Sequence, residues 1–280
     1  MEKLYQYGWE KYHANTQYTL TDNNQDKTGR VISIKGNTFI LATEKGHLQA
    51  ELLGKILFTL EKWEQPKVGD WVKFIGYDDN ALIEDVLPRF NHLYRKTAGR
   101  EVGKQLIAAN VDQAIIIQGM DHDFNLNRLE RYIVQAVTCK INPVVILNKQ
   151  DLVDDISIYI EGINRLQRNL PVFTCSIKTG EGIEAIQQEI FIPGGTSVLI
   201  GSSGVGKSSL LNTLGRSSQK TSAVSDSTGK GKHTTTTRDL FLLENGAIVI
   251  DTPGMREFGL GFEEDASFAD QFPVISQFAG

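Results

Sequence analysis

A glycine-rich stretch, GSSGVGKSSL, begins at Gly201 and constrains the fold more than any other feature of the chain. It matches the pattern G-x-x-x-x-G-K-[ST] and lies between an apolar run, TSVLI, and a helix-forming segment, KSSLLNTL. Glycines let backbone N–H groups turn toward phosphate oxygens, and the N-terminus of the following helix adds about half a positive charge. A strand, a phosphate-binding loop and a helix are therefore predicted here, as in an α/β protein with a mostly parallel sheet.

Each residue of this loop has an expected role. Lys207 should reach the β- and γ-phosphates and assist catalysis, and the Ser208 hydroxyl should hold Mg²⁺. The residues expected to surround the phosphates are Gly201, Ser202, Ser203, Gly204, Val205, Gly206, Lys207, Ser208 and Ser209.

A second motif, NKQD at 148–151, selects the base. It follows the apolar run PVVIL. Asp151 can accept two hydrogen bonds from the N1–H and 2-amino groups of guanine, which adenine does not offer in that arrangement. Asn148 is expected to brace the loop and meet the base edge, the stem of Lys149 to pack over the ring, and Gln150 to complete the motif. The backbone of Ser176, in CSIKTG, should approach the guanine carbonyl. The expected ligands are therefore GTP and GDP.

A third motif, VIDTPG at 249–254, supplies the remaining part of the site. Asp251, at a strand end, is expected to hold Mg²⁺ through water, and the Gly254 N–H to sense the γ-phosphate. These motifs occur with the base-reading segment before the phosphate loop. A parallel sheet keeps its site if its old termini are joined and the chain is cut elsewhere, because strand-end loops still meet in space. The order predicts a circularly permuted nucleotide-binding domain.

From residue 109 onward, the sequence alternates predicted apolar strands with amphipathic helices, which is typical of a sheet covered by helices. In one such helix Leu126, Leu129 and Ile133 fall on one face, and Asn127 and Glu130 have the spacing of a capping box. The predicted organisation is a lead-in at 1–27, a barrel at 28–88, a basic linker at 89–108, the permuted domain at 109–262 and the start of a C-terminal region at 263–280.

The segment 28–88 contains five short β-like runs separated by turns: GRVISIKG, NTFILAT, GHLQAEL, GDWVKFIG and DNALIEDV. An OB-type barrel, which often binds oligonucleotides, fits this count, and an SH3-like barrel fits nearly as well.

Composition excludes several classes of protein. The net charge of -5 argues against indiscriminate coating of nucleic acid, although basic islands at 89–104 and 216–238 are either solvated loops or contacts to phosphate backbones. The two cysteines, Cys139 and Cys175, provide neither a disulfide framework nor a zinc site. No apolar run is long enough to span a bilayer and no signal peptide is evident, so a cytoplasmic protein without a membrane partner is expected.

The permuted order, the preceding barrel and the stretches GSSGVGKSSL, GKGKHTTTT and DTPGMREFGL resemble the ribosome small-subunit-dependent GTPase A (RsgA) family. The resemblance implies an N-terminal OB domain that contacts 16S rRNA, GTP hydrolysis stimulated by the small ribosomal subunit, and a role in late maturation of that subunit. We further expect a monomer that does not act on DNA. A GTP-gated RNA-binding module with little turnover is the alternative.

The resemblance also bears on catalysis and on zinc. Ras-like enzymes orient the attacking water with a glutamine, and Met255 occupies that place here. The resemblance points instead to His233, which could otherwise be an exposed histidine or an RNA contact, and to Thr235 and Thr236 as Mg²⁺ ligands. Family members usually continue into a subdomain whose Cys/Cys/His/Cys cluster binds Zn²⁺, and the ligands of that cluster are absent from this sequence.

Overall fold

The computed structural model of the chain describes residues 2–20, 27–61, 63–77, 80–96, 104–166, 169–215 and 238–252. The predicted site residues His233, Thr235, Thr236 and Gly254 lie outside these ranges, as do 263–280. The helices are α1 (Glu2–Gln6), α2 (Trp9–Thr16), α3 (Gly54–Thr59), α4 (Leu126–Thr138), α5 (Ser157–Leu166), α6 (Ile183–Glu189) and α7 (Lys207–Thr213), with a 3-10 turn, η2, at Gln150–Leu152. The strands are β1 (Thr28–Lys35), β2 (Thr38–Thr43), β3 (Gly46–Leu52), β4 (Trp71–Tyr77), β5 (Asn80–Val86), β6 (His92–Lys96), β7 (Lys104–Ala109), β8 (Gln113–Gly119), β9 (Asn142–Asn148), β10 (Val172–Thr174), β11 (Thr196–Ile200), β12 (Arg238–Leu242) and β13 (Ile248–Asp251).

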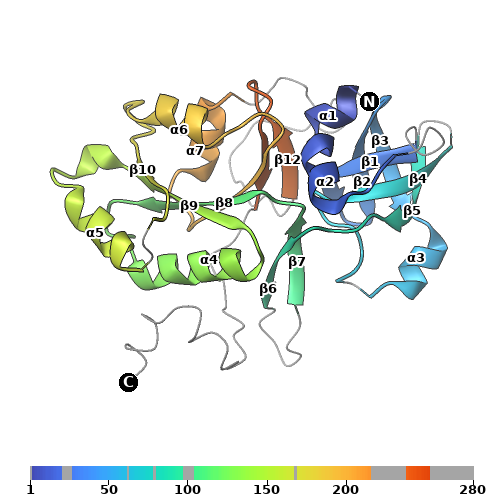
Figure 1. Cartoon of the computed structure of the whole chain (residues 1–280), viewed down its shortest axis with the longest axis horizontal. Helices are drawn as coiled ribbons and strands as arrows, with labels where there is room; N and C mark the ends of the chain where they lie inside the picture. Colours follow the sequence, from blue (N-terminus) through green and yellow to red (C-terminus); the bar gives the residue numbers. More distant parts are fainter. Residues whose placement is uncertain are drawn as a thin grey trace.

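One sheet runs through most of the described chain, in the order β10-β9-β8-β11-β13-β12-β1-β2-β3-β5-β4. Strands β10, β9, β8, β11 and β13 are parallel, and β12 joins them antiparallel. From β8 the chain continues outward to β9 and β10 and then returns to β11 on the other side of β8 (Figure 1). The strand order therefore reverses between β8 and β11, which is where parallel α/β sheets bind ligands.

Helices cover both faces of this parallel part. Successive residues of β8 alternate between two apolar clusters, because side chains of a strand point to opposite faces. Ile116 packs with Leu129 of α4 and Ile163 of α5, whereas Ile115 packs with Ile186 of α6 and with α7. Figure 1 shows α4 and α5 below the sheet and α6 and α7 above it. The alternation of strand and amphipathic helix predicted this layered arrangement.

Strands β1 to β5 close into a barrel, because β1 pairs with β2 on one side and with β4 on the other. Helix α3 lies between β3 and β4 in the chain, and β3 pairs with β5 rather than with β4. This order is that of an OB-type barrel and not of the SH3-like alternative. The barrel interior is a separate apolar cluster that includes Val31, Leu41, Val72 and Ile83.

Two segments outside the predicted domains have structure of their own. The lead-in forms α1 and α2, and Trp9 packs edge-on against Trp71 of the barrel with ring centroids 4.7 Å apart. The segment predicted as a basic linker forms the antiparallel hairpin β6–β7. Its first basic residue, Arg89, pairs with the fully buried Asp70 at 2.7 Å. The aromatic residues of the lead-in thus complete the core where the barrel meets the parallel sheet.

The predicted capping box of α4 is wrong. The helix begins at Leu126, two residues earlier than that capping box requires, and its N-cap is Asn125, whose side chain accepts a hydrogen bond from the Arg128 N–H at 2.8 Å. Asn125 has an extended backbone (φ -150°), which N-cap residues adopt, and Asn127 lies inside the first turn.

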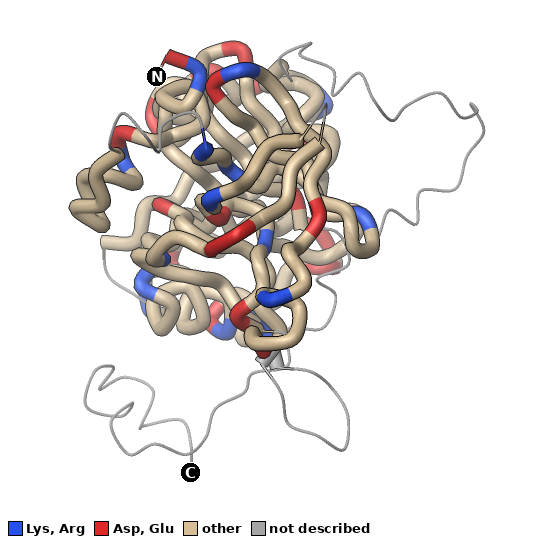
Figure 2. Tube along the Cα trace, turned by 90° about the vertical axis from the view of Figure 1, so that its right-hand side faces the viewer, with Lys and Arg blue, Asp and Glu red and all other residues tan. Residues whose placement is uncertain are grey.

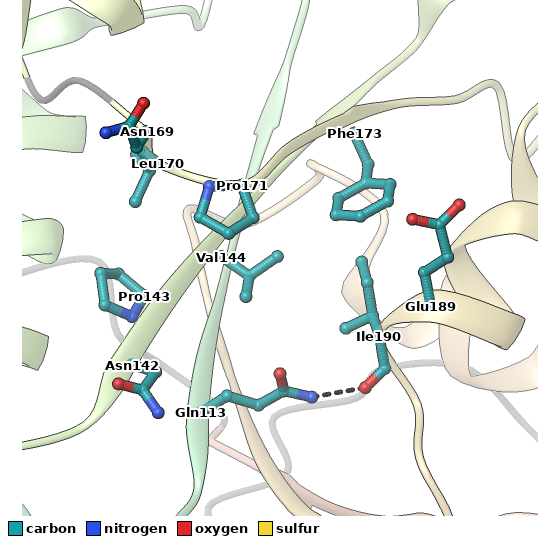
Figure 3. A pocket seen from close by; sticks show the side chains of 10 residues that line it. All are labelled: Gln113, Asn142, Pro143, Val144, Asn169, Leu170, Pro171, Phe173, Glu189 and Ile190. Atoms are coloured by element: carbon teal, nitrogen blue, oxygen red, sulfur yellow. Dashed lines mark hydrogen bonds between the residues drawn. The ribbon is translucent and has the colours of Figure 1, made fainter.

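A cavity of about 440 Å³ opens at the edge of the sheet where the parallel strands begin (Figure 3). Gln113, at the start of β8, donates a hydrogen bond to the Ile190 carbonyl at its floor. This edge is opposite to the predicted nucleotide residues, which follow the strand ends. Among the described residues no group of three or more histidine, cysteine or acidic side chains could hold a metal ion, and no helix is long and apolar enough to cross a membrane.

Candidate nucleotide-binding site

The phosphate loop connects β11 to α7 in a backbone path that requires glycine. Gly206 has φ +106°, and a Cβ there would lie 2.5 Å from Asn148 Nδ2. Gly201 has a similar restriction, because its Cβ would lie 2.5 Å from the Ile117 carbonyl oxygen. Glycine allows both the left-handed conformation and the close contact. The loop is therefore packed directly against β8 and the NKQD segment.

The Lys207 side chain folds back onto the phosphate loop. Its Nζ donates hydrogen bonds to the carbonyls of Gly201 and Ser202, both at 2.7 Å. Ser203, in the loop, and Ser208, in the first turn of α7, are exposed. Two loop carbonyls thus hold the lysine, while these two serines, together with Gly204 and Ser209, are exposed.

Asn148 joins the three segments that the motifs define. Its Nδ2 donates to the Val205 carbonyl of the phosphate loop at 2.8 Å, and its Oδ1 accepts from the Ile177 N–H at 3.1 Å. The side chain is buried, so these bonds are shielded from water. Asn148 therefore fixes the base-reading turn relative to both the phosphate loop and the CSIKTG loop.

The Asp151 carboxylate lies at the mouth of the site, in η2. Ser176 Oγ donates to its Oδ1 at 2.6 Å, and Lys178 Nζ lies 3.6 Å from its Oδ2. These two contacts, the serine hydroxyl above all, lower the pKa of Asp151 below its ordinary value. The group is thus held ionised, the state that accepts hydrogen bonds from the N–H groups of guanine. The Ser176 side chain thus orients Asp151, whereas its backbone N–H, predicted to approach the guanine carbonyl, donates to the Glu181 carbonyl at 3.0 Å.

Lys149 and Gln150 are held by acidic residues. Lys149 has a left-handed backbone (φ 69°), and its Nζ pairs with Asp121 Oδ2 at 2.5 Å. Gln150 Nε2 donates to Glu181 Oε1 at 2.7 Å and so ties the turn to the CSIKTG loop. Asp121 thus fixes the position of the Lys149 ammonium group.

A cavity of about 480 Å³ connects the base-reading and phosphate-binding parts. Its lining residues come from all three segments: Asn148, Lys149, Asp151, Leu152, Ile177, Lys178, Gly204, Gly206 and Ser209. Asp151 and the phosphate loop therefore share one cavity, as binding of a single nucleotide requires.

Asp251 ends β13, the strand next to the phosphate-loop strand. Its Cα partners are Leu199 in β11 and Asp239 in β12. The next residue, Thr252, donates its hydroxyl to the Leu199 carbonyl at 2.7 Å. Carboxylate and hydroxyl oxygens suit Mg²⁺, and Asp251 and Ser208 follow adjacent strands at the same edge of the sheet. This donor set fits the ion.

The sequence alone did not identify several residues that support the site. Asp121 and Asp123 lie in the turn after β8, and Asp123 Oδ2 accepts a hydrogen bond from the Ser202 hydroxyl of the phosphate loop. Arg128 pairs with the same Asp123 oxygen at 2.9 Å. Their position could have indicated a role, because this turn follows β8, which lies between β9 with the NKQD motif and β11 with the phosphate loop. Ile177 and Lys178 were likewise missed, although they belong to the CSIKTG loop.

The fold and the site define a circularly permuted P-loop GTPase. A sequence model described as RsgA GTPase matches residues 86–261. The small ribosomal subunit biogenesis GTPase RsgA 1 of Bacteroides thetaiotaomicron is 41% identical over 270 residues, 96% of this chain and 76% of the relative. The protein of the same name from Listeria monocytogenes (serovar 1/2a) is 38% identical over 95% of this chain and 75% of its own length. The chain belongs to the RsgA GTPase family.

Solved structures agree with this assignment. YjeQ from Thermotoga maritima superposes with a TM-score of 0.61 at 29% identity, covering 81% of this chain and 74% of that one. YloQ, described as a circularly permuted GTPase, superposes with a TM-score of 0.62 over 92% of this chain and 82% of its own, and at 22% identity it shows the fold alone.

Proposed function

We propose that the protein hydrolyses GTP during maturation of the small ribosomal subunit, acting in the cytoplasm as a monomer and binding 16S rRNA through its barrel. The curated relatives bear the name small ribosomal subunit biogenesis GTPase. The observation that carries the nucleotide part is the pair of hydrogen bonds by which Asn148 fixes the base-reading turn against the phosphate loop and the CSIKTG loop.

In this proposal each group of side chains contacts a different part of the nucleotide. Asp151 pairs with guanine and excludes adenine, while Lys207 exchanges its two loop carbonyls for phosphate oxygens. Mg²⁺, held by Asp251 and Ser208 together with Thr235 or Thr236, would supply positive charge to the phosphates. His233 orients the attacking water, and the Gly254 N–H contacts the γ-phosphate; the support for these last roles is the resemblance of their motifs.

The charge distribution supports a selective RNA contact rather than general coating. The chain has a net charge of -5, and Figure 2 shows basic and acidic residues interspersed along the described trace. Basic side chains nevertheless occur on β12 and β6, where burial and, to a smaller extent, the charge of Arg95 lower the pKa of the partly buried Arg238. Such neighbouring guanidinium groups favour phosphate backbones.

GTP turnover of the whole chain, measured with and without purified small ribosomal subunits, tests the proposal. We expect slow turnover alone and strong stimulation by the subunits, with no comparable stimulation by large subunits. A His233→Ala variant should lose rate while keeping its GTP affinity. Binding of GTP without turnover in either condition would favour the RNA-binding module instead, an alternative that the GTPase names of the relatives do not favour.

A further inference from the structure

The barrel and the nucleotide-binding sheet are joined by a short strand pairing. Strand β1 of the barrel pairs with β12 through Ser33 opposite Asp239 and Ile34 opposite Arg238. Strand β12 pairs on its other side with β13, where Asp239 lies opposite Asp251. Residues directly opposite on antiparallel strands project from the same face. Ser33, Asp239 and Asp251 therefore form one row across three strands, from the barrel to the predicted magnesium carboxylate.

The row contains one hydroxyl group, on Ser33, and two carboxylates, on Asp239 and Asp251. Two carboxylates directly opposite on antiparallel strands repel each other. Ser33 Oγ donates a hydrogen bond to Asp239 Oδ1 at 2.5 Å, and the serine is 6% exposed. The buried hydroxyl thus fixes the direction of the Asp239 carboxylate relative to Asp251. Without this donor Asp239 would be free to turn toward Asp251.

Strand β1 is anchored more firmly at its other end. Arg30, three residues before Ser33, is 1% exposed and donates to the Asn110 carbonyl and to Thr196 Oγ1 of β11. The register of β1 against β2 shifts between Val31 and Ser33, an irregularity that re-aims side chains. We therefore expect a movement of the barrel to change first the two-residue pairing of β1 with β12, where Ser33 lies opposite Asp239.

We propose that Ser33 is a positioning residue through which the RNA-binding barrel and the nucleotide site influence each other. Binding of the barrel to RNA strengthens or weakens the Ser33 hydrogen bond to Asp239, and the orientation of Asp239 sets the electrostatic environment of Asp251. By reciprocity, the nucleotide state changes the affinity of the barrel for its partner. This inference rests on the proposed function, because it requires both an RNA-bound barrel and a magnesium role for Asp251.

The test is a coupling measurement on the whole chain. The Kd of a fluorescent, non-hydrolysable GTP analogue with Mg²⁺ is measured with and without small ribosomal subunits, and the ratio of the two values is the coupling factor. We expect Ser33→Ala to lower this factor about tenfold, since it removes a hydrogen bond to a charged group. Asp239→Ala should do the same, and the double variant should lose little more than either single one, because both changes remove the same bond. Ser33→Thr, which keeps the hydroxyl, should retain most of the coupling.

Thr43→Ala is the matched control. Thr43 is also a buried barrel hydroxyl, but it donates to the Gly46 carbonyl within the barrel at 2.7 Å. Its loss should lower the melting temperature and leave the coupling factor unchanged. An unchanged factor in Ser33→Ala, or an equal fall in Thr43→Ala, would overturn the inference. A coupling factor of one in the wild-type protein would also overturn the inference. The proposed function is tested separately, by the turnover assay with small ribosomal subunits.

Discussion

At the scale of single residues, the site depends on side chains that hold one another rather than on ligand-facing groups alone. Asp151 is oriented by Ser176, Lys149 by Asp121, and Asn148 by two backbone groups from different loops. A nucleotide-reading group that is already oriented loses less entropy when it binds. This pre-orientation makes the base specificity of the site testable by conservative changes.

Replacement of Asp151 by Asn should change the preferred base from guanine to xanthine. The amide presents a donor where the carboxylate presents an acceptor, so it faces the guanine N–H groups without a partner and matches the 2-carbonyl of xanthine instead. We expect GTP affinity to fall about 100-fold or more, with a gain for xanthosine triphosphate. Competition binding with both nucleotides measures this. Equal loss for both nucleotides would contradict the base-reading role of Asp151.

Replacement of Ser176 by Ala should raise the pKa of Asp151 toward the ordinary carboxyl value. The serine hydroxyl is the largest cause that lowers this pKa, and Lys178 contributes less. Guanine recognition needs the ionised carboxylate and is lost as pH falls through this pKa, so in the variant the loss should begin at a higher pH. A ¹³C NMR titration of the Asp151 carboxyl measures the shift. Lys178→Ala is the control, with a smaller rise expected.

At the scale of elements, the motif-bearing strands and loops were largely predictable from the sequence, because buried parallel strands appear as apolar runs and their loops carry the motifs. Asp121 and Asp123 were not predictable, since a pair of acidic residues in a turn is indistinguishable from a solvated loop until the strand order places it beside the phosphate loop. The β6–β7 hairpin was missed for a related reason. Its strands are short and β6 is polar. The hairpin is held from outside by the Gln135 side chain of α4, which donates to the Tyr94 carbonyl, and by the Val68 carbonyl, which accepts from the Ala109 N–H.

The phosphate loop offers a prediction at this scale. Gly206→Ala should lower the free energy of unfolding by about 1–3 kcal/mol, because it combines a left-handed φ of +106° with a Cβ placed 2.5 Å from Asn148 Nδ2. The matched control is Gly204→Ala, where φ is +84° and nothing lies within 4 Å of the new Cβ, so only the backbone strain remains. Urea unfolding of both variants measures the difference. Equal losses would mean that contact with Asn148 does not restrain the loop.

At the scale of the whole molecule, one buried arginine joins the barrel, the lead-in and the parallel sheet. Arg30 is 1% exposed and donates hydrogen bonds to the carbonyls of Tyr7, Gly69 and Asn110 and to the hydroxyl of Thr196. Its guanidinium carbon also lies 5.6 Å from the centre of the Trp71 ring. Burial lowers the pKa of Arg30 to about 10, which leaves the group charged at neutral pH. Segments far apart in the sequence therefore share one cation at their junction.

Arg30→Met should destabilise the whole chain rather than one part of it. The change leaves the buried Tyr7 and Asn110 carbonyls without the Arg30 donor, and each buried acceptor left unsatisfied costs about 1–3 kcal/mol. We expect the barrel and the nucleotide-binding domain to lose stability together, seen as a common shift in urea unfolding followed by Trp fluorescence and by nucleotide binding. Arg165→Met, at an arginine whose side chain is 81% exposed, is the control and should change little. If Arg30→Met shifted the fluorescence transition alone, the barrel would unfold independently of the nucleotide-binding domain, and Arg30 would not couple the stability of the two parts. The coupling proposed between Ser33 and Asp251 would then lack the anchor at Arg30 that it requires.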